Sequence, residues 1–583
     1  MRILSGIIFF ILGTQSAFAA DTGPDRDAFV ATSDPLGEPV KSVVYLEQNW
    51  SAAQSVQFYF TEQGSRIIPY DWFLALEQAD AETPFRDNQN ILKFRYLPQN
   101  PGDRNPDGLP VGFVAGRGLG RRWVGMTCAA CHTAEIRLGE TGYRVDGAPT
   151  QGDVQAFISA LTAALQRVQS DPQKFARFAA KVLGANNTPA NQAELQVQLR
   201  AMINTRVAYN LRNFAGYNPN LPQQPPPTRY ARLDAVGAIV NEVYFHATPV
   251  AGLSSPIAGA MLADAPASYP FLWDTPQHDF VQWLGIAKSG GPLDIFSLSR
   301  NVGEVLGVFA EVTIPEKPSV LNIGYASSVK ILELTDLENL IKTLWSPQWP
   351  ADFPKIDQSA AAKGAGLYQT NCLACHALIN RTDPNRKVKA VMNDSGTDNR
   401  ASTNFFNRTG ASGKINGVNV NFVPFTPKIG PIADADSMLS NEVIGIVLGQ
   451  FKLPPPDELQ QIGFRGVQPK NVALAAAREG ARYKSRPLDG IWATAPYLHN
   501  GSVPNLDALL RPAAQRPLSF SIGVKTFDPV RVGYLTDVPG FPRFNVKNPD
   551  GTPNMGNSNA GHEFGANLTE IERGWLLEYL KTL

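Results

Sequence analysis

The sequence predicts a mainly α-helical protein with long loops and extra helices. Phe157, Leu161 and Leu165 recur in steps of four within residues 153–184 and place one apolar face on a helix. Residues 193–214 continue this pattern. The 49 glycines and 46 prolines among 583 residues indicate many loops between helices rather than one long bundle.

Two more helices are predicted in the second half of the chain. Residues 361–372 carry Gly364, Leu367 and Tyr368 on one side. The last helix opens with a capping box, Thr569 to Glu572. Its apolar residues recur at helical spacing: Leu568, Ile571, Trp575, Tyr579, Leu580 and Leu583. We expect these two helices to pack together.

All four cysteines lie in two Cys-x-x-Cys-His motifs, Cys128–Cys131–His132 and Cys372–Cys375–His376. This pattern is typical of c-type haem attachment. The two thiols reach the vinyl groups of one porphyrin and form thioethers, and the adjacent histidine takes one axial position on iron. The sequence therefore predicts two covalently bound haems c.

Zinc and a disulfide are the alternatives for these cysteines. Zinc would need four converging ligands, and the motifs lie far apart in the sequence. A disulfide would leave the two adjacent histidines unexplained. A helix that leads into such a motif and packs on a C-terminal helix is typical of a class I cytochrome c domain, so we expect two cytochrome c-like haem domains.

The N-terminus predicts export. Met1-Arg2 is followed by an apolar run to Leu12, and Ala17-Phe18-Ala19 offers a cleavage site, so residues 1–20 resemble a signal peptide. An uncleaved anchor is the alternative, although the run is too short to span a bilayer. We expect a periplasmic or secreted protein with no membrane span after cleavage. Residues 21–350 would form the N-terminal haem domain with the active site, and residues 351–583 the C-terminal haem domain.

Charge and size limit the partners. The 52 basic and 52 acidic residues balance, which argues against nucleic acid. Two haem motifs in 583 residues leave more chain than electron carriage requires, so we expect a buried pocket at one haem. We expect a monomer that admits a redox partner protein.

The six histidines limit which residues can ligate the two irons. His132 and His376 belong to the motifs, and none of the seven methionines stands in a recognisable ligand context. One haem can therefore have two histidine ligands while the other keeps an open site for a diatomic ligand. The spare histidines are His246, His278, His499 and His562.

Four segments carry a family resemblance. Residues 486–501, which contain Ala495-Pro496-Tyr497-Leu498-His499-Asn500-Gly501, resemble the Ala-Pro-Tyr-x-His-x-Gly signature of bacterial dihaem cytochrome c peroxidases and MauG. Residues 105–113, 300–304 and 556–563 are similar to the rubber oxygenase and fatty-acid dioxygenase branch of that superfamily.

The resemblance implies different roles for the two haems. The N-terminal haem would keep an open side for dioxygen, and the C-terminal haem would have two histidine ligands. In the peroxidases the sixth ligand follows the signature, which makes His562 the first choice opposite His376. His499 would then lie near the same haem or its propionates, and the reverse assignment is the alternative.

The middle of the chain should build the first distal pocket. The family places a tryptophan between the haems, and Trp273 or Trp283 could take that position, with core packing as the alternative for each. Phe296 is a candidate apolar wall over the first iron. If His278 reached that iron, the open-site hypothesis would fail.

Four functions compete: a dioxygenase, a peroxidase, an electron carrier and a gas-binding sensor. Size and family branch favour a dioxygenase that adds O2 to a carbon–carbon double bond of a hydrophobic substrate, either an unsaturated fatty acid or a polyisoprene. A peroxidase would need a distal acid–base group and an electron donor. The peroxidase is the first alternative.

Overall fold

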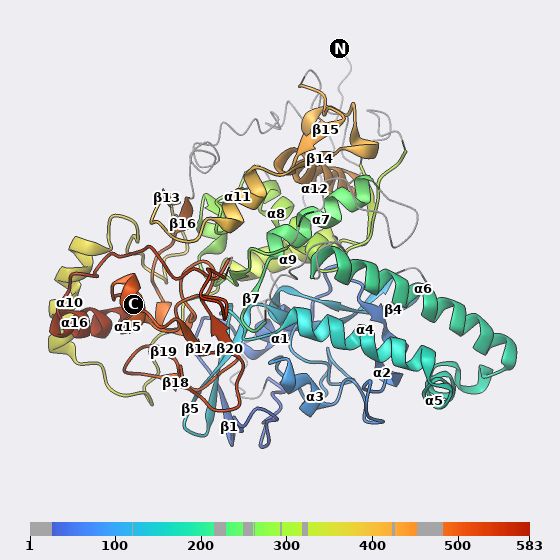
Figure 1. Cartoon of the computed structure of the whole chain (residues 1–583), viewed down its shortest axis with the longest axis horizontal. Coiled ribbons are helices and arrows are strands. Elements are labelled where there is room, and N and C mark those ends of the chain that lie inside the picture. The colour runs from blue at the N-terminus through green and yellow to red at the C-terminus, as the bar shows by residue number, and fades with distance from the viewer. Residues whose placement is uncertain are drawn as a thin grey trace, which may run out of the picture.

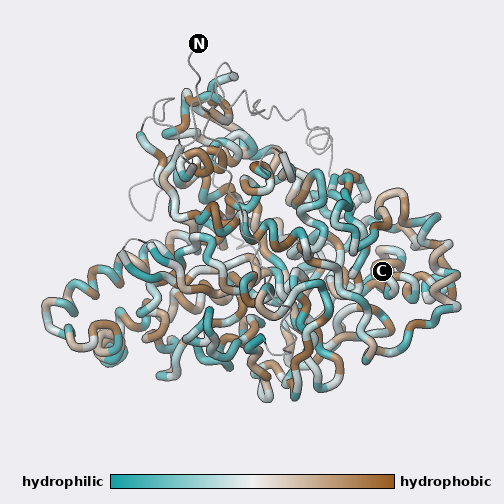
Figure 2. The backbone as a smooth tube through the Cα atoms, turned by 180° about the vertical axis from the view of Figure 1, so that it is seen from behind, coloured by the Kyte–Doolittle hydropathy of each residue, from teal (hydrophilic) through white to brown (hydrophobic). Residues whose placement is uncertain are grey.

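The computed structural model describes residues 26–118, 120–214, 229–248, 261, 263–291, 294–316, 324–422, 426–451, 482–554 and 556–583. The predicted signal peptide, residues 1–20, lies outside the described residues. Among the described residues, none of the helices combines the length and apolar character that a bilayer span requires. Figure 2 agrees, because apolar segments along the chain are short and interspersed with polar ones.

The fold is mixed α/β, and the prediction of a mainly α-helical protein is wrong. The chain is 38% helical and 16% strand, with several small sheets. The strands are two to six residues long, too short for an alternating pattern to stand out from the sequence.

Two three-stranded sheets surround the first Cys-x-x-Cys-His motif. In one, β1 (Ser42–Tyr45) pairs in parallel with β6 (Thr141–Asp146), and β5 (Thr133–Leu138) pairs antiparallel with β6. In the other, β4 (Arg121–Met126) lies between β2 (Ile68–Pro69) and β3 (Phe113–Gly118). The first motif therefore begins in a short turn between β4 and β5, where helices had been expected.

The predicted helix at 153–184 is two helices. They are α4 (Val154–Ser170) and α5 (Pro172–Leu183), and Asp171 separates them because its carboxylate caps α5 by accepting from the backbone N–H groups of Gln173 and Lys174. The third helix, α6 (Pro189–Asn213), packs on α4 and confirms the helix predicted at 193–214. These three helices extend to one side of the molecule (Figure 1).

A second group of helices lies above the two three-stranded sheets in Figure 1. It shares one apolar core and comprises α7 (Ala235–Ala247), α8 (Ile295–Gly307), α9 (Ile331–Ile341), α11 (Arg400–Phe406) and α12 (Ala435–Phe451).

Short two-stranded sheets connect the helical groups. They are β7 (Arg232–Leu233) with β8 (Ala267–Ser268), β9 (Phe280–Val281) with β10 (Ala287–Lys288), β11 (Val312–Thr313) with β12 (Ala326–Ser327), β13 (Val391–Asn393) with β16 (Tyr483–Ser485), β14 (Thr409–Ala411) with β15 (Ile432–Asp434), β17 (Ser519–Ser521) with β20 (Arg543–Asn545), and β18 (Phe527–Asp528) with β19 (Gly533–Tyr534). The short helices are α1 (Ala52–Phe60), α2 (Tyr70–Ala75), α3 (Asn88–Lys93) and α15 (Leu506–Leu509).

The helix pair predicted in the second half of the chain is confirmed. α10 (Gln358–Asn371) packs on α16 (Glu570–Lys581), and both halves of the Thr569–Glu572 capping box are formed. Gly364 makes the close approach possible, since a Cβ there would lie 2.1 Å from the carbonyl oxygen of Trp575.

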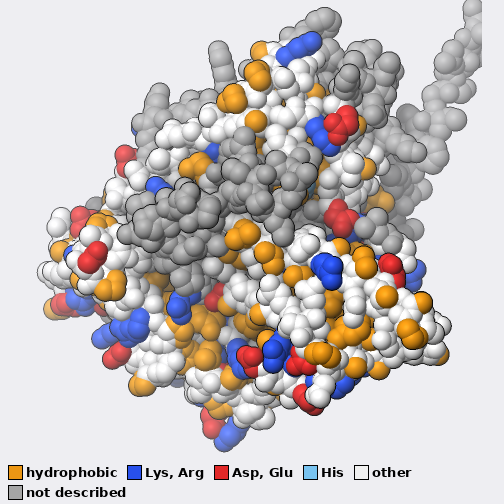
Figure 3. Space-filling model, turned by 45° about the vertical axis from the view of Figure 1, so that its right-hand side comes forward, with side chains coloured by type: hydrophobic (Ala, Val, Ile, Leu, Met, Phe, Trp, Pro, Cys, Tyr) orange, Lys and Arg blue, Asp and Glu red, His pale blue; other side chains and the backbone are white. Residues whose placement is uncertain are grey.

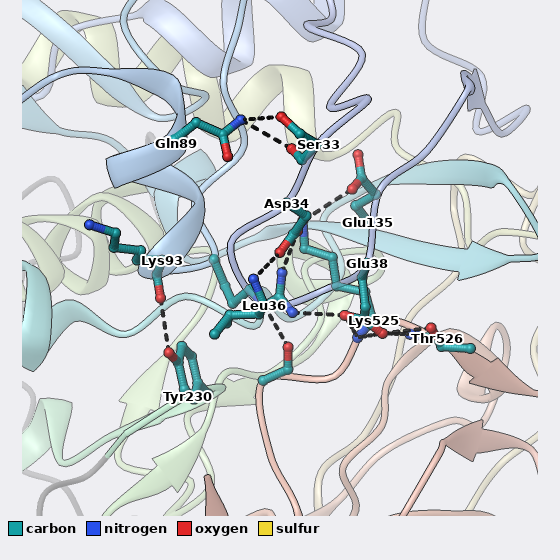
Figure 4. A network of polar contacts seen from close by, with 12 residues as sticks. Ser33, Asp34, Leu36, Glu38, Gln89, Lys93, Glu135, Tyr230, Lys525 and Thr526 are labelled. Atoms are coloured by element: carbon teal, nitrogen blue, oxygen red, sulfur yellow. Dashed lines mark hydrogen bonds and ion pairs between the residues drawn. The ribbon is translucent and has the colours of Figure 1, made fainter. Parts of the chain in front are cut away.

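The two predicted halves of the chain share their largest apolar core. Tyr143 and Phe353 pack with Trp492 and Phe527 in this cluster. A buried polar network near the N-terminus adds a second link: the Glu38 carboxylate accepts from the backbone N–H groups of Lys525 and Thr526 (Figure 4). The division at residue 350 remains a prediction.

Charge on the described surface is mixed. On the face shown in Figure 3, basic and acidic side chains are interspersed. This agrees with the balanced composition of the sequence.

Candidate functional site

Two large cavities each contain one Cys-x-x-Cys-His motif. The first holds about 1210 Å³ of space between protein atoms and is lined by Cys128 and His132. The second holds about 1310 Å³ and is lined by Cys372, Cys375 and His376. In each case the motif histidine and at least one attachment thiol lie at the wall of the same cavity.

The first motif is held by the strand before it and by one close glycine contact. Thr127 caps the turn of Cys128–Ala130 with its hydroxyl oxygen, which accepts from the backbone N–H of Ala129. Gly112 has a φ of +79° and lies so near the motif that a Cβ would be 2.0 Å from the nitrogen of Ala130. Only glycine fits there, which gives the 105–113 segment a structural role.

His132 lies at the wall of the first cavity as a neutral imidazole. Burial lowers the pKa of His132 to about 4, against an opposing effect of the Pro270 carbonyl. Its Nδ1 has no hydrogen-bond partner within the geometric limits, and its ring meets the edge of the Tyr269 ring. A neutral histidine is the form that binds a metal.

The second motif follows α10 directly. Nδ1 of His376 lies 2.6 Å from the carbonyl oxygen of Arg486 and donates to it, which leaves Nε2 as the free nitrogen. The Tyr368 hydroxyl donates to the carbonyl of His376 at 2.7 Å. The ring of His376 is thus oriented in the manner usual for metal-binding histidines.

His562 faces His376 across the second cavity. Their ring centroids are 6.1 Å apart and their planes are inclined by 60°. Two imidazoles on one metal place their centroids about 6 Å apart, because each metal–nitrogen bond is about 2 Å long. Burial, and next the neighbouring His376, lower the pKa of His562 to about 4.

The loop that carries His562 is fixed from two sides. The Arg516 guanidinium donates to the carbonyls of Asn559, Gly561 and His562. Gly561 has a φ of +74°, and a Cβ there would lie 2.3 Å from the carbonyl carbon of Gly396. The position of His562 is therefore built into the backbone.

The cysteine environments argue against a zinc site or a reactive dithiol. Burial raises the pKa of the Cys128 thiol to about 11, that of Cys131 to about 12 and that of Cys372 to about 11. Zinc binding and thiol exchange require thiolates, which lower pKa values favour. Among the described residues, no three His, Cys, Asp or Glu side chains gather closely enough to hold a metal ion.

The cavities meet at a common wall, which we call the partition. Its residues line both cavities: Ser268, Tyr269, Pro270, Trp283, Lys484, Arg486 and His499. Trp283 is held by a hydrogen bond from its indole N–H to the carbonyl of Ser268 at 2.8 Å. Of the two predicted tryptophans, Trp283 lies between the cavities, while Trp273 lies in the core and donates to the carbonyl of Asp489.

His499 belongs to the partition, and its ring stacks on Tyr483 at 3.7 Å between centroids. Burial, and next the Arg232 charge, lower the pKa of His499 to about 3. Within the described residues, His562 and not His499 is the ring in contact with His376.

Three other sequence candidates lie apart from the described cavity walls. The ring of Phe296 contacts the Lys288 ammonium, 4.9 Å from its centroid, and lines neither cavity. His278 is buried beside Lys484, with Nδ1 3.2 Å from the ammonium, and also lines neither cavity. His246 pairs with Glu442 at 2.7 Å between α7 and α12.

Sequence reasoning missed the polar side chains of the first cavity. Glu304 on α8 accepts a hydrogen bond from Gln282, and Arg300 one turn earlier forms an ion pair with Glu338 on α9. The spacing of Arg300 and Glu304, four residues on one helix, was the available signal. Burial raises the pKa of Glu304. At Glu338 burial acts in the same direction, but Arg300, Asn301 and Lys342 together outweigh it and hold the pKa below its usual value.

The comparisons with known proteins agree with this site. The chain is 31% identical over 612 aligned positions to "Uncharacterized protein y4iJ" of Sinorhizobium fredii (strain NBRC 101917 / NGR234), covering 93% of this chain and 94% of that protein. The chain belongs to the y4iJ family. "Uncharacterized protein y4iM" of the same strain is 26% identical over 46% of this chain and 49% of its own length.

Residues 482–521 match the family model described as RoxA-like, cytochrome c-like. This stretch includes three partition residues, Lys484, Arg486 and His499, and also Tyr483, which lines the second cavity. The y4iJ-family chain is thereby related to the RoxA-like cytochromes c, which are haem oxidoreductases. Its cavities fit haem c, because each pairs an attachment thiol with a half-buried histidine whose pKa is lowered by burial.

Proposed function

We propose that this protein is a periplasmic or secreted oxidoreductase with two covalent haems c that adds dioxygen to a carbon–carbon double bond of a hydrophobic substrate. The observation that carries the proposal is the asymmetry of the cavities. In the second, His562 faces His376 at the separation of two ligands on one metal. In the described wall of the first, the only histidine besides His132 is His499, whose ring stacks on Tyr483.

Haem c supplies an iron that binds a small ligand on a free axial face and changes its oxidation state. His132 and His376 would be the proximal ligands, and His562 the second ligand at the C-terminal haem. This arrangement supports substrate chemistry in the first cavity and an electron-storing role for the second.

The described apolar side chains of the first cavity suit a hydrophobic substrate. Their apolar surface favours binding of a substrate that carries an alkene and little charge. Since Phe296 lies outside this wall, the role predicted for it would be taken by others: Leu233, Ala235, Val236, Ala267, Val281 and Leu284. An unsaturated fatty acid or a polyisoprene has the required chemistry.

Oxygen-18 labelling tests the proposal. The purified protein is given ¹⁸O2 with oleate or with polyisoprene and without peroxide. Two labelled atoms in one product, or one in each of two cleavage products, are expected. A Cys128→Ser/Cys131→Ser variant should keep the second haem and lose oxygen uptake, while a pyridine haemochrome assay and intact mass should count two haems in the parent protein and one in the variant.

One observation favours a second candidate, reduction of hydrogen peroxide. The first cavity contains two carboxyl groups whose pKa values are moved in opposite directions, Glu304 upward and Glu338 downward. Such pairs supply a proton donor and an ionised partner for acid–base work. Turnover that requires peroxide and a reduced donor, with no label from ¹⁸O2, would assign the protein to this class.

Export has its own test. The mature N-terminus should begin near Asp21 in protein recovered from a periplasmic fraction. Full-length protein in the cytoplasm would contradict this part of the proposal.

A further inference from the structure

The partition contains two buried cations. Lys484 belongs to β16, and Arg486 follows that strand by one residue. Both side chains line both cavities, and only 4% of Lys484 and 7% of Arg486 is exposed. Neither forms an ion pair within the described part of the chain.

Lys484 has a weak set of partners for a buried ammonium. Its ammonium contacts Nδ1 of His278 at 3.2 Å, a neutral group. Burial drives the pKa of Lys484 well below its usual value, and Asp279 opposes this only at longer range. The Asp279 carboxylate is itself engaged by two backbone N–H groups.

Arg486 is similarly short of a counter-ion. Its Nη2 donates to the carbonyl of Phe271 at 2.6 Å, its guanidinium lies 3.6 Å from the centre of the Phe271 ring, and its Nε has no partner. Asp274 and Asp489 act on it from beyond ion-pair distance. Of these, Asp274 is already paired with Arg386.

Buried charges are costly unless an opposite charge meets them. Two cations at the wall of two cavities therefore call for anions inside those cavities. A haem carries two propionate carboxylates, and a wall shared by both cavities can serve a carboxylate from each side.

We propose that Lys484 and Arg486 form one anion site that binds propionate carboxylates of both haems. The proposal rests on the two haems of the proposed function. It goes further in making two residues of one short segment hold both cofactors. Because the same cations line both cavities, removing one should move both reduction potentials in the same direction.

Lys484→Met tests the site through redox titration and thermal unfolding of the holoprotein. Loss of the positive charge stabilises the ferric state, so both midpoint potentials should fall by about 59 mV or more, a tenfold change for a one-electron couple. The melting temperature should also fall, because a propionate is left buried without its partner. Lys484→Arg should keep both potentials near the parent values.

Lys174→Met is the matched control. Lys174 is also a buried cation, 8% exposed, but it lies on α5, pairs with Glu77 and lines neither cavity. Its loss should leave both potentials unchanged. If Lys484→Met is not recovered, Lys484→Gln provides the same comparison with a polar side chain.

Three results would overturn the inference. Unchanged potentials with a higher melting temperature would mean that Lys484 is an unpaired buried ammonium. A shift of one potential alone would rule out a shared site. Unchanged potentials with a raised KM for oleate, but not for methyl oleate, would assign the carboxylate to the substrate. Fewer than two haems in the parent protein would instead refute the proposed function.

Discussion

His376 and His562 present their imidazole rings to each other across the second cavity, 6.1 Å apart between centroids. The first ring is oriented by the carbonyl of Arg486, and the loop of the second is held by Arg516. Four residues that lie far apart in the sequence, His376, Arg486, Arg516 and His562, thus set the positions of the two rings. This facing pair of histidine rings distinguishes the second cavity from the first.

The acid group of the first cavity gives a prediction on activity. Glu304→Gln keeps the shape and the contact with Gln282 but removes the ionisable proton. We expect oxygen-dependent turnover to stay within a few-fold of the parent, and any peroxide-dependent turnover to fall about 10²–10⁴-fold, the usual contribution of a general acid or base. Steady-state rates with each oxidant measure this. An equal loss with both oxidants would place Glu304 in the dioxygenase reaction.

The same substitution has a pH signature in stability. Burial raises the pKa of Glu304 above its ordinary value of 4.5 in the folded state, so the unfolded chain releases its proton first. The free energy of unfolding therefore falls as pH rises from 4.5 through the pKa of Glu304 in the folded protein, and Glu304→Gln should abolish this fall. Melting temperatures from pH 4 to pH 8 should show the variant gaining on the parent as pH rises. The exposed Glu140→Gln serves as control, and a constant difference would contradict the prediction.

Two glycines of α10 form a matched pair. Gly364→Ala would drive a Cβ into the Trp575 carbonyl, whereas a Cβ at Gly366 meets nothing within 4 Å. We expect Gly364→Ala to destabilise the protein by about 1–3 kcal/mol or more and Gly366→Ala to stabilise it by about 0.5–1 kcal/mol. Denaturant unfolding of holoprotein measures both. Similar values for the two variants would contradict the packing of α10 on α16.

The link between Glu38 and residues 525–526 gives a prediction on stability. The carboxylate is 5% exposed and accepts from Lys525 N–H at 2.9 Å, Thr526 N–H at 2.8 Å and Arg95 Nη2 at 2.8 Å (Figure 4). Glu38→Ala removes one of the two carboxylates that pair with Arg95, Asp34 being the other, and leaves the buried N–H groups of Lys525 and Thr526 without their acceptor, so it should cost about 1–3 kcal/mol. Glu140→Ala, in an exposed pair with Lys41, should cost about 0–1 kcal/mol. Equal costs would contradict the structural role of this link.

Local patterns predicted the helices and the haem motifs well. The capping box at Thr569 and the helix before Cys372 depend on neighbours within a few residues, and both are present. The strands around Cys128 were missed because pairs such as β1 with β6 are made between distant segments. A two- to six-residue strand leaves too few positions for a period to be read.

The site could be predicted only in part for the same reason. Cys-x-x-Cys-His carries its chemistry in five adjacent residues, but the partition is assembled from segments near 270, 283 and 485. The sequence offered Trp273 and Trp283 equally for the position between the haems. In the structure Trp283 lies in the partition, whereas Trp273 lies in the core. Lys484 and Arg486 carried no sequence signal, because an exposed and a buried cation look alike in sequence.

Electron paramagnetic resonance of the resting ferric protein tests the central claim, that one iron is closed by two histidines and the other is open. The parent should show one low-spin and one high-spin haem. His562→Ala should convert the low-spin signal to high-spin, and His499→Ala should leave it low-spin. Conversion by His499→Ala but not by His562→Ala, or two low-spin haems in the parent, would contradict the account.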